Sequence, residues 1–215
     1  MEIKYWSDIA CPFCYIGSTR MKKALKELNL YDDTPLEFKS FQLDPTLPTT
    51  TDKTMLENFS SGHGMTTEQA TAQIEQISKM GASDGLKVDL LNAVPTNTLD
   101  AHRLIKLADS LGDRDLTEKV IDAFYQVYFS NGESIADHDV LKKAATTAGL
   151  DAEKIDEVLN SRQFEKEVRT DQMEAQQLGI QGAPFFVIDN KYGISGAQPY
   201  ETFVQALQQV QAKEG

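Results

Sequence analysis

Two cysteines, Cys11 and Cys14, are separated by two residues and are the only cysteines in the 215-residue sequence. Thiols at this spacing close a small disulfide ring with little backbone movement. A helix is expected to begin at Pro12, because proline is favoured at the first helical position. Cys11 would then lie over the free N–H groups of the first turn, which stabilise a thiolate and make the sulfur nucleophilic. Cys14, one turn further in, is expected to be less exposed and suited to resolving a mixed disulfide.

Other uses of the cysteine pair are weaker. A zinc site needs about four ligands, and the three histidines, His63, His102 and His138, lie far apart at no finger-like spacing, so no metal is expected. A purely structural disulfide across so short a loop restrains little of the unfolded chain. The remaining alternative is a pair of reduced cysteines packed as small hydrophobic side chains. The position of the pair between a predicted strand and a predicted helix disfavours this alternative.

The segments around the cysteines predict a β-α-β unit. Residues 2–6 alternate between apolar and polar side chains, which is typical of a short strand. Apolar residues then recur at helical spacing from Pro12 to about Asn29, and a second alternating stretch at 36–41 predicts another strand. The cysteine pair therefore lies at the turn between the first strand and the helix.

The rest of the chain predicts a helical block followed by a β-β-α unit. From about residue 50 to 178, apolar residues recur at helical spacing between capping residues. Thr66, with Gln69 three residues later, predicts a capping box at the start of one of these helices. The apolar run 185–188 predicts a buried strand, Asp189-Asn190 a turn, and 191–195 the second strand of a hairpin. A final helix begins near Pro199. The fold class is therefore α/β, in which residues 1–50 and 179–215 form one domain and residues 51–178 a large all-helical insertion.

Composition limits the partners and the compartment. The 21 Lys and Arg against 33 Asp and Glu give a net charge of −12, so nucleic acid and anionic membrane surfaces are poor partners. No apolar stretch approaches the roughly 18 residues of a membrane span. The first residues show neither the basic nor the apolar region of a secretion signal, so a cytoplasmic location is expected.

Four segments carry a family resemblance. They are Ser7-Asp8, Cys11-Pro12-Phe13-Cys14-Tyr15-Ile16-Gly17, Gly182-Ala183-Pro184-Phe185-Phe186-Val187-Ile188 and Asn97-Thr98-Leu99-Asp100-Ala101-His102-Arg103. The chain resembles the DsbA-like thioredoxin-fold oxidoreductases over essentially its whole length. The last of these segments resembles the FrnE-like branch, which is related to 2-hydroxychromene-2-carboxylate isomerases. The resemblance implies a thioredoxin fold, β-α-β followed by β-β-α, that the helical insertion interrupts.

The resemblance also implies roles for the residues of the site. Cys11 would be the attacking thiol, Cys14 the resolving thiol, and Pro184 a cis-proline that faces them. Pro12, Phe13, Ala183 and Pro184 would contact substrate, and Phe13, Tyr15 and the Pro184 loop would line an apolar groove. Phe13 stands where Trp or His is often found, and Ala183 where Val or Thr is usual, so the direction of the reaction stays open.

Two residues of the 97–103 segment have two interpretations each. Asn97 is either a helix cap, a position that suits asparagine, or a residue that supports the site from behind. His102 is either a histidine of the helix surface or core, or a second such supporting residue. His63, between Gly62 and Gly64, is expected in a loop rather than in a catalytic role.

The expected activity is that of a thiol–disulfide oxidoreductase that forms a mixed disulfide with its substrate. It needs no cofactor beyond the redox-active cysteine pair, and glutathione is a candidate co-substrate. Its partners would be protein or small thiol and disulfide substrates, and a homodimer is a candidate assembly. The enzymatic alternative is a glutathione-dependent isomerase or a kappa-class-like glutathione transferase, although such relatives typically carry Ser where Cys11 stands. A binding module with an inert cysteine pair is the third alternative.

Overall fold

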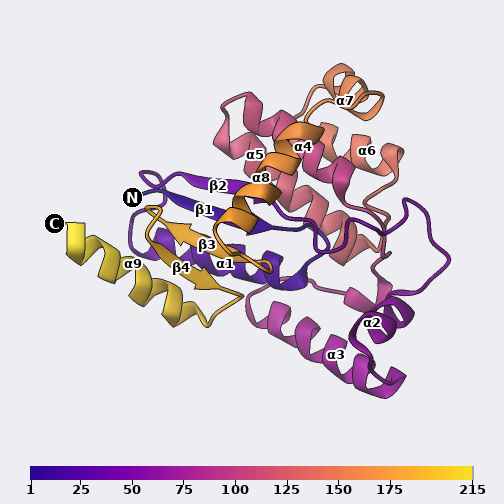
Figure 1. The fold of residues 1–215 in the computed structure, drawn as a ribbon, viewed down its shortest axis with the longest axis horizontal. Helices are drawn as coiled ribbons and strands as arrows, with labels where there is room; N and C mark the ends of the chain where they lie inside the picture. Colours follow the sequence, from indigo (N-terminus) through magenta and orange to yellow (C-terminus); the bar gives the residue numbers. More distant parts are fainter. Residues whose placement is uncertain (215) are drawn as a thin grey trace.

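The computed structural model describes residues 1–214 and contains a four-stranded mixed sheet with helices on both faces (Figure 1). The strand order is β2-β1-β3-β4, in which β1 runs parallel to β2 and antiparallel to β3, and β3 and β4 form a hairpin. The strands are β1 (Ile3–Ser7), β2 (Leu36–Ser40), β3 (Phe185–Ile188) and β4 (Tyr192–Ser195). The α/β fold with a long helical segment between its two halves is confirmed.

Helices make up most of the remaining chain. None of those that the structure describes has the length and hydrophobicity that crossing a membrane requires. The helices of the described residues are α1 (Pro12–Glu27), α2 (Met55–His63), α3 (Thr67–Ser83), α4 (Leu99–Ser110), α5 (Arg114–Tyr125), α6 (His138–Ala148), α7 (Ala152–Leu159), α8 (Glu165–Gln177) and α9 (Tyr200–Glu214). A short 3-10 turn lies at Leu90–Asn92 and a π-helical turn at Gln126–Asn131.

The strands and most helices form where the pattern predicts them. Asp189 and Asn190 adopt positive φ angles of 50° and 53°, which the tight hairpin turn requires and which these residue types tolerate. The predicted capping box at Thr66 is present and starts α3. Helix α2 was not predicted as a separate element, although Thr54 and Glu57 form a second capping box at its start.

The sheet is buried on both faces. On one face, Tyr5 of β1 lies between Phe38 of β2 and Phe186 of β3, and Phe186 packs edge-on against Phe203 of α9. On the other face, Trp6 is fully buried with Ala175 of α8 and with Ile180 beyond it, and partly buried apolar side chains of β3 pack against them. Burial on both faces explains why β3 is a continuous apolar run rather than an alternating one.

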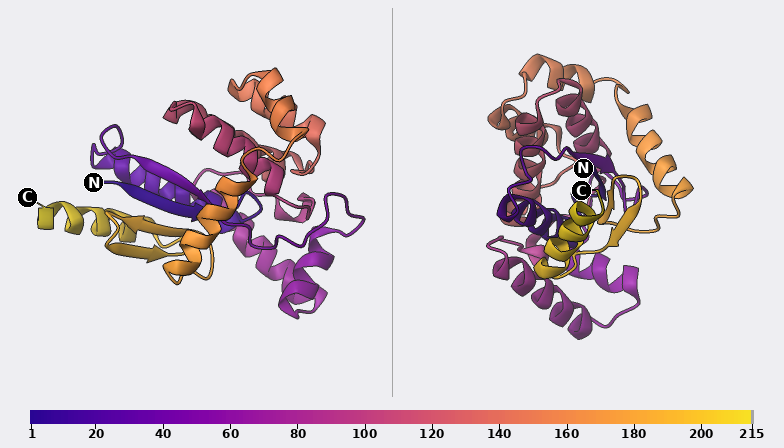
Figure 2. Two further views of the ribbon diagram at one scale, coloured as in Figure 1. Left: turned by 45° about the horizontal axis from the view of Figure 1, so that its top comes forward. Right: turned by 90° about the vertical axis from the view of Figure 1, so that its left-hand side faces the viewer.

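The helical segment divides into two groups around the sheet. Helices α4 to α7 lie on one side of the molecule and helices α2 and α3 on the opposite side, in all the views (Figures 1 and 2). The loop that follows β2 leads into α2, so the carboxyl ends of β1 and β2 lie near the junction of the two groups.

A buried ionic cluster joins α8 to the sheet and to α4. The Asp171 carboxylate lies 2.5 Å from Lys106 Nζ and accepts the Ser40 N–H at 2.8 Å, while its carbonyl accepts the Trp6 indole N–H at 2.9 Å. Lys106 also donates to the Phe38 carbonyl at 3.2 Å. Helix α8 lies inside the range 51–178 and yet covers the sheet. The boundary at residue 178 stays a prediction, and Gly215, at the end of the other predicted segment, lies outside the described residues.

The Asp171 contacts predict a large loss of stability in Asp171→Ala. Removing this carboxylate leaves the Lys106 ammonium buried without its counter-charge, so the free energy of unfolding should fall by about 3–5 kcal/mol. Urea unfolding followed by circular dichroism measures the loss. Gln176→Ala, an exposed change on the same helix, is the matched control and should change stability by no more than about 0.5 kcal/mol. Equal stabilities of the two variants would contradict the assigned role of the cluster.

Candidate active site

Cys11 is the N-cap residue of α1, and Pro12 is its first helical residue, as the sequence predicts. The Cys11 sulfur accepts the N–H of Cys14 at 3.3 Å. Negative charge at this end of a helix is stabilised by the free N–H groups and by the helix dipole. Both thiols are free and buried, with Cys11 2% exposed and Cys14 fully enclosed. The two sulfurs therefore occupy one helical turn in different environments.

Burial raises the pKa of the Cys14 thiol well above its ordinary value, and the neighbouring Cys11 adds to this rise through a hydrogen bond and its charge. Two groups act against the rise: the backbone N–H of Asp8, which donates to Cys14 Sγ at 3.4 Å, and the side chain of Ser7. The Ser7 hydroxyl also lies 2.9 Å from the hydroxyl of Tyr125, the last residue of α5. Cys14 therefore keeps its proton at neutral pH.

The loop before β3 brings Ala183 and Pro184 next to the cysteines. The Cys11 thiol lies 3.7 Å from the Ala183 carbonyl, and the peptide bond between Ala183 and Pro184 is cis. Pro184 is buried against α1, where a Cβ atom at Gly17 would lie 3.1 Å from its ring. The absence of a side chain at Gly17 therefore permits this close approach.

A cavity of about 430 Å³ opens beside Cys11. Phe13 and Ala183, both expected to contact substrate, lie in its wall, as does Pro12, whereas Pro184 is buried behind Ala183. The other lining residues come from the loop after β2, from α2 and from more distant segments: Asp8, Ala10, Leu43, Asp44, Leu47, Met55, Asn58, Phe59, Gly62, His63, Ile77, Leu90, Pro95, Thr98 and Tyr128. Most of this wall was not predicted.

Two aromatic residues lie elsewhere than expected. Tyr15 does not line the cavity, and the prediction that it would is wrong. It is 9% exposed and stacks in the core on Tyr125, with a ring-centroid distance of 4.5 Å. His63, expected in a loop, is the last residue of α2 and does line the cavity, with Nδ1 3.0 Å from the Phe59 carbonyl.

Asp8 connects the cysteines to α4 and to the cavity wall. Its carboxylate accepts the Leu43 N–H at 2.8 Å with one oxygen and lies 3.0 Å from His102 Nε2 with the other. His102 is fully buried, so it is a core histidine. It also holds Asp8, whose backbone N–H donates a hydrogen bond to the Cys14 sulfur. Sequence reasoning gave Asp8 no role, although it lies three residues before Cys11 in the segment that carries the family resemblance.

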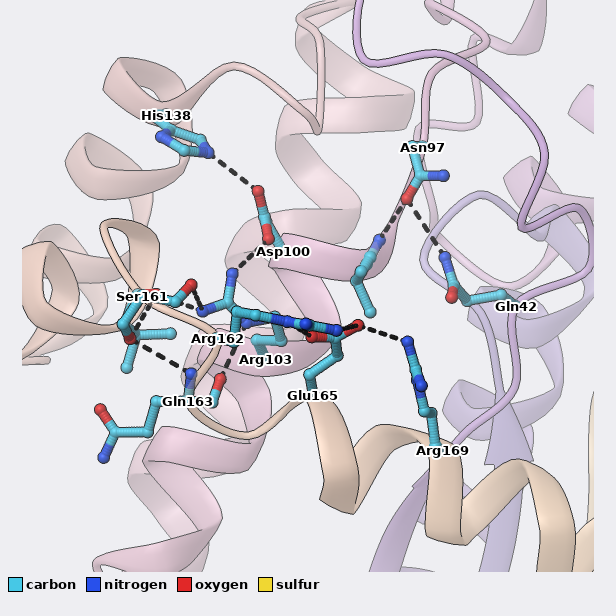
Figure 3. Close-up of polar contacts among 12 residues, drawn as sticks. Gln42, Asn97, Asp100, Arg103, His138, Ser161, Arg162, Gln163, Glu165 and Arg169 are labelled. Atoms are coloured by element: carbon cyan, nitrogen blue, oxygen red, sulfur yellow. Dashed lines mark hydrogen bonds and ion pairs between the residues drawn. The ribbon is translucent and has the colours of Figure 1, made fainter.

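Asn97 fastens the loop that forms one wall of the cavity. Its side-chain N–H groups donate to the carbonyls of Pro45 and Leu47 at 3.0 and 2.9 Å. Its side-chain oxygen accepts the Leu99 N–H at 2.9 Å and faces Gln42 Nε2 at 3.3 Å (Figure 3). The N-cap residue of α4 is Thr98, so the interpretation of Asn97 as the cap of this helix is wrong. Asn97 lies one residue before the cap, where its side chain accepts the Leu99 N–H and holds the loop of the cavity wall.

Two other residues of the same segment, Asp100 and Arg103, make contacts with neighbouring helices and with the residues after α7. The Arg103 guanidinium donates to the Asp100 carboxylate at 2.6 Å and to the carbonyls of Ser161 and Gln163 at 2.6 and 2.8 Å (Figure 3). Asp100 also lies 2.8 Å from the half-exposed His138. These contacts tie α4 to the connection between α7 and α8.

The described part of the chain, residues 1–214, brings no three His, Cys, Asp or Glu side chains together as metal ligands. The site itself holds two thiols, the first at a helix N-terminus and the second enclosed.

Several known proteins are similar to this chain in sequence or in structure. The crystal structure of a probable DsbA oxidoreductase from Streptomyces coelicolor is 40% identical, with a TM-score of 0.92 over 99% of this chain and 90% of that one. YwbO, an uncharacterized protein of Bacillus subtilis, is 25% identical over 217 residues, which are 100% of this chain and 99% of YwbO. A 2-hydroxychromene-2-carboxylate isomerase has a TM-score of 0.71 over 100% of this chain and 98% of its own. Its identity is 11%, so this likeness concerns the fold alone.

The resemblance seen in four short segments extends over nearly the whole sequence. The DSBA-like thioredoxin domain family matches residues 2–208, which include both cysteines, the helical segment and the β3–β4 hairpin. The chain therefore belongs to the DSBA-like thioredoxin domain family.

Proposed function

We propose that this protein is a thiol–disulfide oxidoreductase in which Cys11 attacks and Cys14 resolves. The observation that carries the proposal is the N–H of Cys14 pointing at Cys11 Sγ at 3.3 Å, at the start of a helix. This donor and the helix dipole favour the thiolate of Cys11, both when it attacks and when it leaves. The 40% identity to a probable DsbA oxidoreductase supports the same assignment.

The proposed reaction balances with the two thiols alone. The Cys11 thiolate attacks one sulfur of a substrate disulfide, forms a mixed disulfide and releases the other substrate sulfur as a thiolate. Cys14 then loses its proton and attacks Cys11 Sγ, which releases the second substrate thiolate and leaves a Cys11–Cys14 disulfide. The substrate is reduced by two electrons and the protein is oxidised by two, and the reverse sequence oxidises a dithiol substrate. No bound cofactor is needed.

The surrounding residues have supporting roles in this proposal. The Ala183 backbone and the side chains of Pro12 and Phe13 contact the substrate beside Cys11. His102 is a positioning residue for Asp8, whose N–H donates to the Cys14 sulfur. Asn97 holds the loop that forms the wall of the cavity.

Trapping of the mixed disulfide tests the order of attack. Cys14→Ala should accumulate disulfide-linked complexes with client proteins, because the Cys11 mixed disulfide then has no internal thiol to resolve it. Cys11→Ala is the matched control and should trap none, because Cys14 is fully enclosed. Non-reducing gels of cells quenched with a thiol-blocking reagent show the complexes, which should vanish when reductant is added. If Cys14→Ala traps nothing and retains a glutathione-dependent activity on a small molecule, the isomerase or transferase alternative replaces the proposal.

The burial of Cys14 predicts slow, pH-dependent modification. In Cys11→Ala the only remaining thiol is Cys14, whose pKa is raised chiefly by burial. Because the thiolate is the form that reacts, alkylation by iodoacetamide should be slow at pH 7 and still rising above pH 9. The Cys14→Ala variant, in which Cys11 remains, should react faster at pH 7. Mass spectrometry over a pH series measures both rates, and equal rates at neutral pH would contradict the assignment of the two thiols.

A further inference from the structure

We propose that the cavity beside Cys11 selects thiol and disulfide substrates that are apolar, and neutral or positively charged, next to the reacting sulfur, and that it disfavours glutathione. The inference rests on the proposed function and deepens it, because it names the class of substrate for the same site. It follows from what the cavity wall contains and from what the wall lacks.

The wall is mainly apolar. Phe13 and Leu43 are partly exposed, at 36% and 48%, and Leu47, Met55 and Phe59 complete the surface between the start of α1, the loop after β2 and α2. A substrate that covers these side chains gains about 25 cal/mol for each Å² of apolar surface removed from water. The volume of about 430 Å³ lies within the range of small-ligand sites. The site therefore favours apolar groups beside the substrate sulfur.

The charged groups in the wall are carboxylates. Asp8 is a buried residue of the wall and is held by the Leu43 N–H and His102. Asp44 is exposed in the loop after β2, where its carboxylate accepts the N–H and the hydroxyl of Thr46. Among the lining residues that the structure describes there is no Lys or Arg, and His63 is the single residue able to carry positive charge. The net charge of −12 adds a field of the same sign.

Glutathione is poorly matched to this wall. It carries two carboxylates and one ammonium group, so it is a net anion at neutral pH. Sites that hold carboxylates commonly supply Arg or Lys as partners. A carboxylate enclosed without such a partner loses hydration that nothing replaces. A cysteine within a polypeptide has no carboxylate of its own. In an extended segment, apolar neighbours of that cysteine can cover the apolar wall, and a nearby Lys or Arg can interact with the carboxylates of the wall.

The test compares the rates at which matched disulfides oxidise the reduced protein. The probes are glutathione disulfide and three disulfide-linked peptides of equal length, with the same apolar residues beside the cysteine and with Lys, Gln or Glu two positions away. Each rate is divided by the rate at which the same disulfide reacts with free 2-mercaptoethanol, which removes differences in intrinsic reactivity. The reactions run at pH 8, at which histidine side chains ordinarily carry no charge. We expect the normalised rate to be highest for the Lys peptide, followed by the Gln peptide, the Glu peptide and glutathione disulfide. The differences between these rates should shrink at 0.5 M salt, where the Debye length falls to roughly 4 Å.

A charge-reversal variant assigns the preference to the cavity. Asp44→Lys should raise the relative rates of the Glu peptide and glutathione disulfide, and lower that of the Lys peptide, each by about two- to five-fold, the size expected for one exposed charge. Asp33→Lys makes the same change in net charge in the turn after α1, at the opposite end of that helix from Cys11. The Asp33→Lys variant should leave the order of the four normalised rates and the ratios between them unchanged.

The outcomes separate the two proposals. If all four probes oxidise the protein at equal relative rates, or if glutathione disulfide is the fastest, the charge selection is wrong and the oxidoreductase assignment stands. If Asp33→Lys shifts the rates as much as Asp44→Lys does, the overall field and not the cavity sets the preference, and the inference is wrong. If no probe forms a disulfide at Cys11, the proposed function itself fails.

Discussion

The first N–H groups of α1 lack the carbonyl partner four residues earlier that the rest of the helix has, and one of them, the Cys14 N–H, is shared between the carbonyl and the sulfur of Cys11. Everything around the site depends on keeping that sulfur at that end of the helix. β1 delivers the chain to the turn, Pro12 begins the helix, and Gly17 permits the loop before β3 to pack against it. The N–H groups of the first helical turn also favour negative charge on the Cys11 sulfur, so the geometry of the helix start and the chemistry of the thiol have one physical origin.

Asp8 is the second point on which the site depends, because it connects three parts of the chain. Its backbone contacts the buried cysteine, while its carboxylate contacts α4 through His102 and the loop after β2 through the Leu43 N–H. A change in any of these three parts therefore alters the surroundings of Cys14. The cluster around Asp171 has a similar function on the other face, where it fixes α8 and α4 on the sheet. These two buried carboxylates hold the helical segment in place around the cysteines.

The sequence was sufficient for features that a short stretch of chain determines. The strand, turn and helix around Cys11, the β3–β4 hairpin and the Thr66 cap all depend on neighbouring residues, and all were predicted correctly. The cavity could not be predicted, because its wall combines residues from position 8 to position 183 whose proximity depends on the complete fold. Tyr15 shows the limit on a smaller scale. It lies two residues after Phe13, and the helical rotation between them turns Phe13 outward and Tyr15 into the core.

The central position of β1 has a consequence for how the chain assembles. β1 pairs with β2 within the first 40 residues, but its other edge pairs with β3, which begins at residue 185. During synthesis, that edge stays unpaired until β3 has been made, and the Ala183 carbonyl reaches Cys11 only with the segment that leads into β3. Such long-range pairing slows folding and leaves an open strand edge to which other chains can add. A nascent molecule therefore carries both cysteines before it has all the residues that form the cavity beside Cys11.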